Sequence, residues 1–193
     1  MFKRLNTGFG GKALGDRSVL ILSACWILAA AACGQASAED TLENTVKAAY
    51  LSKLAAFVEW PPAAFETSAS PLRICVIGDD PFKATLDRAV TGLTVAGRPV
   101  QVVRYGEAVP AMACQIAYVA GSAAQSKADA LRVLQGQPIL TVTDQPGEEG
   151  EQGIVSFVVR DSRVRFAIDQ HEATQDHLAL SGKLLSLALE VRR

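Results

Sequence analysis

Two kinds of hydrophobic pattern alternate along the chain from about residue 40 onward. In one, apolar residues recur at steps of three and four, which is typical of one face of a helix; the other is a short run rich in Val and Ile, typical of a buried strand. The first pattern predicts helices over residues 40–59, 82–90, 123–135 and 181–191, and a short helix near Asp169. The second predicts strands over residues 72–77, 113–120, 139–143, 154–159 and 163–168, and two short strands within residues 91–105.

This order of elements predicts an α/β fold, a single-domain sandwich whose central mixed, largely parallel sheet is flanked by helices. Asp161 and Ser162 suit the turn of one C-terminal hairpin. A chain of 193 residues with 49% hydrophobic content can bury one sizeable core, so nothing in it requires a second folded domain.

Turn and capping residues mark the ends of several elements. Asp80 is placed to cap the helix that follows the strand of residues 72–77, and Pro81 suits a first helical position because it has no N–H to leave unpaired. Pro61 and Pro62 prevent the first helix from continuing and hold Trp60 out of the helical conformation. Ser181 is in position to cap the last helix.

The first 38 residues have the pattern of a secretory signal peptide. Four basic residues precede an apolar run over residues 19–33, and Ala36 and Ala38 provide a small-residue cleavage site. The run is shorter than the roughly 20 residues that span a membrane. We expect residues 1–38 to be removed and residues 39–193 to form the exported domain, with lipidation at Cys33 as the alternative.

The charge of the exported part argues against nucleic acid as a partner. Removal of residues 1–38 takes away four of the 19 basic residues and one of the 20 acidic residues, which leaves a net charge of −4. No basic patch interleaved with aromatic residues remains.

Cys75 and Cys114 are the two cysteines of the exported part. An even pair outside the cytoplasm indicates a disulfide, and both residues fall on predicted strands. A redox-active pair is the alternative, but no Cys-x-x-Cys motif is present to lower a thiol pKa.

The remaining candidate chemistry has simpler explanations. His171 and His177 are six residues apart, whereas the two histidines of a helical zinc-protease motif are four apart. Asp79 and Asp80 could form a catalytic carboxylate pair at a strand end, although a turn residue followed by a helix cap explains both. We therefore expect no enzyme activity, no metal and no cofactor.

Several segments together resemble the YfiR family of periplasmic proteins. In chain order they are Val-Lys-Ala-Ala-Tyr-Leu at 46–51, Phe-Val-Glu-Trp-Pro at 57–61, Ile-Cys-Val-Ile-Gly-Asp-Asp-Pro-Phe at 74–82, Cys114 before an apolar strand, Ile-Leu-Thr-Val-Thr-Asp at 139–144, Gly-Ile-Val-Ser-Phe-Val at 153–158, Val-Arg-Phe at 164–166 and Leu-Ser-Gly-Lys-Leu-Leu at 180–185. The resemblance implies a small α/β sandwich and transfers a family disulfide onto Cys75 and Cys114. The family's other disulfide does not carry over, because residues 144–159 contain no cysteine.

The resemblance also implies a function. The chain is similar to non-enzymatic periplasmic regulators, so we expect it to bind the periplasmic domain of an inner-membrane diguanylate cyclase and to repress that enzyme. Repression would lower cyclic di-GMP and restrain biofilm formation. An outer-membrane lipoprotein is implied as a further partner, while a kinase in place of the cyclase and a homodimer stay open. The alternative is a periplasmic small-molecule-binding sensor that serves a histidine kinase or an outer-membrane receptor.

For the partner or ligand surface we expect a set of aromatic, charged and turn residues: Trp60, Pro61, Phe65, Asp79, Arg165, Ser181 and Lys183. Trp60 is the most distinctive of them, because an aromatic residue before two prolines either fills the rim of the core or anchors a partner. The sensor alternative predicts a pocket near Trp60, Asp79 and Ser181.

Overall fold

The computed structural model describes residues 41–144 and 150–193 of the 193-residue chain. The predicted signal peptide and the lipidation alternative at Cys33 lie outside the described residues. The part of the chain from Thr41 to Arg193 forms one compact unit.

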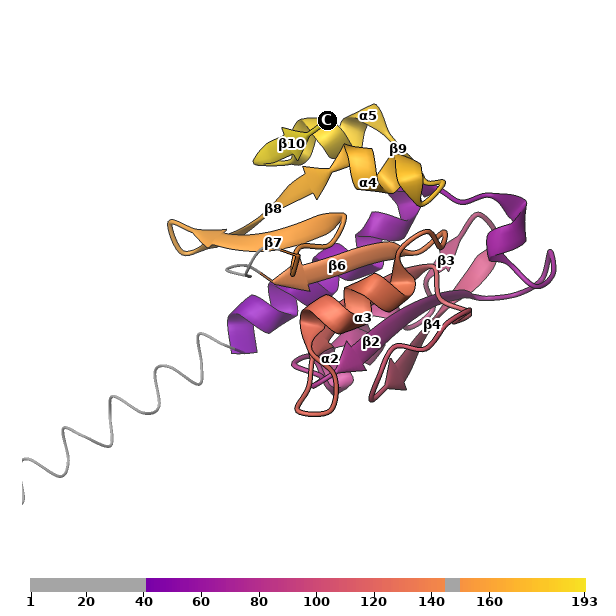
Figure 1. Ribbon diagram of the computed structural model, residues 1–193, viewed down its shortest axis with the longest axis horizontal. Coiled ribbons are helices and arrows are strands. Elements are labelled where there is room, and N and C mark those ends of the chain that lie inside the picture. Colours follow the sequence, from indigo (N-terminus) through magenta and orange to yellow (C-terminus); the bar gives the residue numbers. More distant parts are fainter. Residues whose placement is uncertain (1–40, 145–149) are drawn as a thin grey trace, which may run out of the picture. The chain divides into compact units, whose positions relative to one another are not determined.

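An eight-stranded sheet forms the centre of this unit, in the order β10-β8-β7-β6-β5-β2-β4-β3 (Figure 1). Its strands are β2 (Leu72–Gly78), β3 (Thr94–Val95), β4 (Arg98–Tyr105), β5 (Ile116–Gly121), β6 (Leu140–Asp144), β7 (Val155–Arg160), β8 (Arg163–Asp169) and β10 (Glu190–Arg192). The five strands from β7 to β4 run parallel, while β8 and β3 pair antiparallel with the two ends of this group. The predicted mixed, largely parallel sheet is therefore confirmed.

Helices cover both faces of the sheet, because the side chains of the central strands alternate between two cores. Ile74 and Val76 of β2 belong to the larger core, which includes residues of the helix over residues 41–54 and of α2 (Ala84–Val90). Cys75 and Ile77 belong to the second core, under α3 (Lys127–Leu134). In Figure 1, α3 lies in front of the sheet and the helix of residues 41–54 lies behind it.

The first predicted helix ends earlier than its sequence pattern indicates. The α-helical stretch ends at residue 54, a 3-10 turn η1 (Ala55–Phe57) follows, and β1 (Val58–Glu59) pairs antiparallel with β9 (Ala179–Leu180). The expected helix up to residue 59 is wrong over these last residues. The strand that recruits β1 lies more than a hundred residues later in the chain, so no local pattern reveals the pairing.

Two helix caps that the sequence predicted, at Asp169 and Ser181, are present in the structure. Asp169 accepts a hydrogen bond from the Glu172 amide at 3.0 Å and begins α4 (Gln170–Gln175). Ser181 accepts one from the Leu184 amide at 3.2 Å and begins α5 (Gly182–Leu187). Both predicted caps are confirmed, because each is a contact within three residues.

The expected last helix up to residue 191 is wrong beyond α5. Glu190–Arg192 instead forms β10, which pairs parallel with β8 from Ala167 to Asp169. The Leu189 amide donates to the Phe166 carbonyl at 2.8 Å. The edge of β8 has backbone N–H and C=O groups that a longer last helix would leave unpaired. These groups pair with residues 190–192, so the chain forms a strand there instead of continuing as a helix.

The predicted hairpin at Asp161 and Ser162 is confirmed between β7 and β8. Both turn residues have positive φ, 51° and 55°, as a two-residue type I′ turn requires.

Candidate functional site

The predicted surface residues occupy three separate places. Five of them lie beside the β1–β9 pair or along the segment that leads from it into β2, and we call this set the Trp60 corner: Trp60, Pro61, Phe65, Ser181 and Lys183. Asp79 follows the opposite end of β2, roughly 20 Å of strand away at about 3.3 Å per residue. Arg165 lies on β8. The structure does not bring Asp79 and Arg165 into one site with Trp60.

Trp60 is held in place by Gln115, a residue that the sequence did not single out. The Trp60 Nε1–H donates to the Gln115 carbonyl at 3.1 Å. The buried Gln115 side chain donates to the Ala64 carbonyl at 2.6 Å and accepts from the Arg73 amide at 2.8 Å. One amide side chain thus ties the segment after Trp60 to the start of β2. The Trp60 indole is half-buried and packs against the larger core, so it lies at the rim of that core.

Arg98 holds the next part of the same segment. Its guanidinium lies over the Phe65 ring, 3.9 Å from the ring centre, and donates to the carbonyls of Thr67 and Ser70 at 3.0 and 2.6 Å. A cation over an aromatic face is favourable, and the planar guanidinium serves two carbonyls at once. Phe65 is therefore a fixed, half-buried part of the corner.

Ser181 and Lys183 reach the corner through β9. The Ser181 amide donates to the Phe57 carbonyl at 2.9 Å, and the Lys183 ammonium lies 5.8 Å from the centre of the Phe57 ring. Lys183 and Pro62 are exposed, and Pro61 is half-buried. The corner thus presents an aromatic and proline surface with one exposed lysine, Lys183, at its side.

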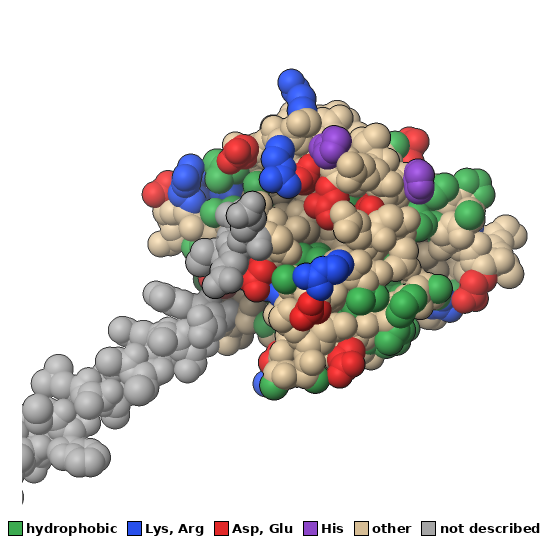
Figure 2. All heavy atoms as spheres, viewed as in Figure 1, with side chains coloured by type: hydrophobic (Ala, Val, Ile, Leu, Met, Phe, Trp, Pro, Cys, Tyr) green, Lys and Arg blue, Asp and Glu red, His purple; other side chains and the backbone are tan. Residues whose placement is uncertain are grey.

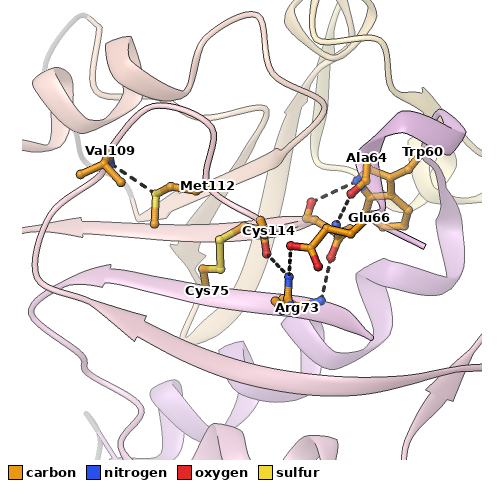
Figure 3. Close-up of a disulfide and its surroundings, with 10 residues drawn as sticks. Trp60, Ala64, Glu66, Arg73, Cys75, Val109, Met112 and Cys114 are labelled. Carbon is orange, nitrogen blue, oxygen red and sulfur yellow. Dashed lines mark hydrogen bonds and ion pairs between the residues drawn. A yellow bond between two sulfur atoms is a disulfide. The ribbon is translucent and has the colours of Figure 1, made fainter. Parts of the chain in front are cut away.

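The predicted disulfide between Cys75 and Cys114 is present (Figure 3). It joins the middle of β2 to the residue two positions before β5, with a Cα–Cα distance of 6.0 Å, and both cysteines are buried. Gln115 directly follows Cys114, so the bond also fixes the residue that holds Trp60. The bond is a structural staple for the Trp60 corner.

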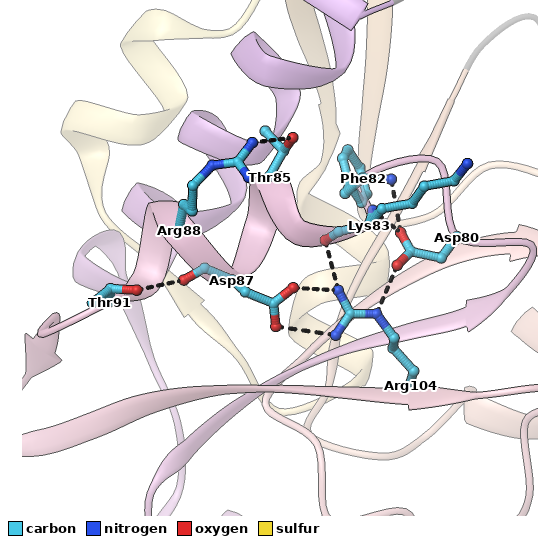
Figure 4. A network of polar contacts seen from close by, with 8 residues as sticks. All are labelled: Asp80, Phe82, Lys83, Thr85, Asp87, Arg88, Thr91 and Arg104. Carbon is cyan, nitrogen blue, oxygen red and sulfur yellow. Dashed lines mark hydrogen bonds and ion pairs between the residues drawn. The ribbon is translucent and has the colours of Figure 1, made fainter.

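Asp80 and Arg104 form a second rigid site at the other end of β2 (Figure 4). Asp80 Oδ1 accepts from the amides of Phe82 and Lys83 at 2.7 and 3.1 Å, so it closes a turn ahead of the helix. The predicted cap at Asp80 and first helical position at Pro81 are wrong, because α2 starts at Ala84, its N-cap residue is Lys83 and no side chain caps it. Arg104 donates to Asp80 at 2.7 Å and contacts both carboxylate oxygens of Asp87 at 3.1 and 2.6 Å. These hydrogen bonds hold the pKa of Asp87 below its ordinary value. The pair Asp79 and Asp80 therefore does not act as two free carboxylates.

A buried charged network, which no local pattern predicts, joins the first helix to β5 and β6. The Lys47 ammonium contacts Glu43 at 2.5 Å and Asp144 at 2.9 Å, and Lys47 is 5% exposed. The Tyr118 hydroxyl donates to Asp144 at 2.6 Å. Burial, together with the nearby Asp144 charge, raises the pKa of Tyr118, which keeps the phenol neutral. The network fastens the helix of residues 41–54 to the sheet.

A hollow lies elsewhere, between α3 and α4. This cavity of about 470 Å³ is lined by residues of α3 and α4, by Arg192 of β10, and by Gly150 and Gln152. Among its lining groups, Arg192 pairs with Asp169, and the pKa of Glu172 is raised to about 7 by burial and by the charges of Asp176 and Asp169. Acidic and basic side chains mix on this face in Figure 2. The pocket expected near Trp60, Asp79 and Ser181 is therefore misplaced, because those residues do not converge.

Fold and site together define an α/β domain that a disulfide staples. In residues 41–144 and 150–193, no group of three or more His, Cys, Asp or Glu side chains is arranged to hold a metal ion. None of the helices in the described ranges is long and apolar enough to cross a membrane.

The model of the YfiR/HmsC-like family matches residues 44–189, and the chain belongs to this family. The family is periplasmic, and its members are regulators rather than enzymes. A comparison with curated proteins found no match.

Proposed function

We propose that this protein is a periplasmic repressor that binds the periplasmic domain of an inner-membrane diguanylate cyclase and lowers cyclic di-GMP. The observation that carries the proposal is the family match over residues 44–189, which covers nearly all of the described domain. The Trp60 corner supports it, because a preorganised aromatic surface loses little side-chain entropy when a partner binds. Restraint of biofilm formation would follow from the lower cyclic di-GMP level.

Cyclic di-GMP in cells tests this proposal. Deletion of the gene is expected to raise the cyclic di-GMP level, and expression of the native chain is expected to restore it. An unchanged level after deletion, together with no membrane cyclase that co-purifies with the protein, would refute the proposal.

A matched pair of charge reversals tests whether the Trp60 corner makes the contact. Lys183→Glu changes the exposed lysine beside Phe57 and is expected to weaken repression. Arg88→Glu makes the same change of charge on α2, where the exposed Arg88 side chain donates to Thr85, and is expected to repress like the native protein. Equal repression by the two variants would place the contact elsewhere.

An outer-membrane lipoprotein that competes for the same surface, or a second copy of the chain, belongs to the same proposal as a further partner. Co-purification from the envelope fraction and the mass of the purified protein in solution test these two partners separately.

The cavity between α3 and α4 supports a second candidate function, that of a small-molecule sensor for a histidine kinase or an outer-membrane receptor. Its volume of about 470 Å³ lies within the range typical of ligand sites. Thermal shift with a panel of small charged molecules tests it, because a ligand at a hundred times its Kd stabilises by about 2.7 kcal/mol. Ala128→Trp should fill the cavity and abolish the shift, whereas the exposed Ala124→Trp should not.

A further inference from the structure

Three arginines lie together on the β7–β8 hairpin: Arg160, Arg163 and Arg165. Arg160 is the direct cross-strand partner of Arg163, and Arg165 is opposite Val158, two positions further along the hairpin. Because side chains alternate between the two faces of a strand, all three arginines project from the same face of the sheet. The other face of the hairpin carries Phe157 and Phe166, which are buried in the larger core.

These three arginines differ in their partners from four of the seven other arginines in the described residues, whereas Arg88 and Arg98 donate to uncharged groups. Arg73, Arg104, Arg132 and Arg192 each pair with a carboxylate. The three hairpin arginines are exposed, and none makes an ion pair with any residue in the described ranges, including Asp161 of the turn between them. We call these three residues the arginine face.

The arginine face carries an energetic cost in the isolated protein. Like charges directly opposite each other on paired strands are destabilising, and the pairing of Arg160 with Arg163 has this arrangement. Residues 39–193 carry a net charge of −4, whereas this face of the hairpin carries three positive charges with no ion-pair partner among the described residues. The sign of the charge on this face is therefore opposite to that of the domain as a whole. Folding does not explain the cluster, whereas a bound anionic group would remove the repulsion.

The face around these arginines is open. α3 covers the central strands and does not extend over the outer end of the hairpin (Figure 1). Toward the base of the hairpin the same face continues into a shallow hollow of about 210 Å³, lined by Ser156, Ala167 and the Asp169–Arg192 pair among others. Basic side chains are visible at this outer end of the molecule in Figure 2.

We propose that the arginine face is a docking surface for an acidic segment of a partner protein. Arginine forms two parallel hydrogen bonds with a carboxylate, and three of them in a fixed register suit carboxylates spaced along an extended segment. A membrane surface fits less well, because the face lacks an exposed aromatic or large apolar side chain to enter the lipid; the exposed Val159 projects from the opposite face. The inference deepens the proposed function by naming the chemistry of a contact with the signalling partner, and it rests on that function for the partner's identity.

A binding experiment tests the surface without the partner. The probe is a short fluorescein-labelled peptide of alternating Glu and Ser, titrated with the native domain and with a triple variant, Arg160→Gln, Arg163→Gln and Arg165→Gln. The native domain should bind the peptide, binding should weaken as salt rises from about 50 to about 500 mM, and the triple variant should bind at least about tenfold more weakly.

The matched control changes three other exposed cations, Lys53→Gln, Lys83→Gln and Arg88→Gln, and should bind like the native domain. The triple variant should unfold at the same temperature as the native domain or a higher one, because it loses the repulsion between Arg160 and Arg163. No binding by the native domain, or equal binding by the triple variant, overturns the proposal. Binding to phosphatidylglycerol vesicles but not to the peptide also overturns it, in favour of a membrane surface.

Cyclic di-GMP measurements separate this proposal from the proposed function. If the native gene represses and the triple variant represses equally well, the arginine face is wrong and the proposed function stands. If the native gene itself has no effect on cyclic di-GMP, the proposed function is wrong, and the peptide titration still decides the fate of the arginine face.

Discussion

Removal of the Cys75–Cys114 bond should destabilise the protein strongly, and the structure allows the size of the effect to be worked out. The bond joins residues 39 positions apart, so it closes a loop of about 40 residues in the unfolded chain. The chain-entropy model assigns a loop of this length about 4 kcal/mol of stability at 25 °C. The free energy of unfolding of a domain this size is typically about 5–15 kcal/mol, so the loss is a large share of the total.

Two perturbations separate the bond from the packing of its atoms. Reduction of the native protein breaks the bond and keeps both sulfurs, which should cost about 4 kcal/mol. The double variant Cys75→Ala and Cys114→Ala also removes sulfur atoms from a buried site and should cost about 1 kcal/mol more. The variant has no thiol left in residues 39–193, so reductant should not change its stability further.

Urea unfolding followed by tryptophan fluorescence measures both effects. Trp60 is the single tryptophan of residues 39–193, and its indole donates to the residue next to Cys114, so it reports directly on this region. With a denaturant slope of about 2 kcal/mol per molar, a loss of about 4 kcal/mol moves the midpoint down by about 2 M urea. A shift below about 0.5 M for the reduced protein would refute the view that this bond is a main support of the domain.

Two further predictions concern the cavity wall and the strand ends. Folding raises the pKa of Glu172 from 4.5 to about 7. Between these two pH values the carboxyl stays protonated in the folded protein but ionises in the unfolded one. The free energy of unfolding should therefore fall as pH rises from about 4.5 to about 7. Glu172→Gln should therefore raise the free energy of unfolding at pH 8 by roughly 1–2 kcal/mol after allowance for solvent screening, and so raise the melting temperature there. It should leave both nearly unchanged at pH 5, and equal effects at both pH values would contradict this cause. Gly78→Ala should lower the free energy of unfolding, measured with urea, by more than about 2 kcal/mol, because its φ is 89° and a Cβ would lie 2.2 Å from the Gly121 carbonyl oxygen. The control Gly92→Ala has φ 71° and no atom within 4 Å of its Cβ, so it should lower the free energy of unfolding by about 1 kcal/mol. Similar losses for the two variants would show that the close approach does not matter.

The structure divides the surface residues expected from the sequence between two places, the Trp60 corner and the arginine face. Trp60 and Phe65 are tethered by Gln115 and Arg98, so they form a rigid aromatic platform. Arg165 belongs with Arg160 and Arg163 on the hairpin, away from that platform. A partner that contacts both surfaces would combine an apolar anchor with charge recognition, and the Lys183 and arginine variants measure the two contributions separately.

Residues that act on their near neighbours were predictable. Asp169 and Ser181 were identified as caps because a cap needs only an amide three residues away, and the Asp161–Ser162 hairpin because its turn needs two residues that accept positive φ. β2 was identified because a strand buried on both faces has to be a continuous apolar run.

Gln115 could not be predicted as the residue that holds Trp60. An isolated glutamine before an apolar strand carries no local signal, and its role arises because β5 lies beside β2 and under the segment after Trp60. The same holds for Lys47 and Asp144, which are nearly a hundred residues apart and meet only when the helix of residues 41–54 packs on the sheet.

The sequence by itself determined the α/β class, the order of most elements, the caps at Asp169 and Ser181 and the cysteine pair, since each depends on periodicity, on neighbours within a few residues or on composition. Only the tertiary structure decided that Val58 and Glu59 pair as a strand, that Glu190–Arg192 joins β8, and which charged groups meet. The physical reason is that backbone groups at a sheet edge and buried charges need partners, and those partners come from parts of the chain that only folding brings together.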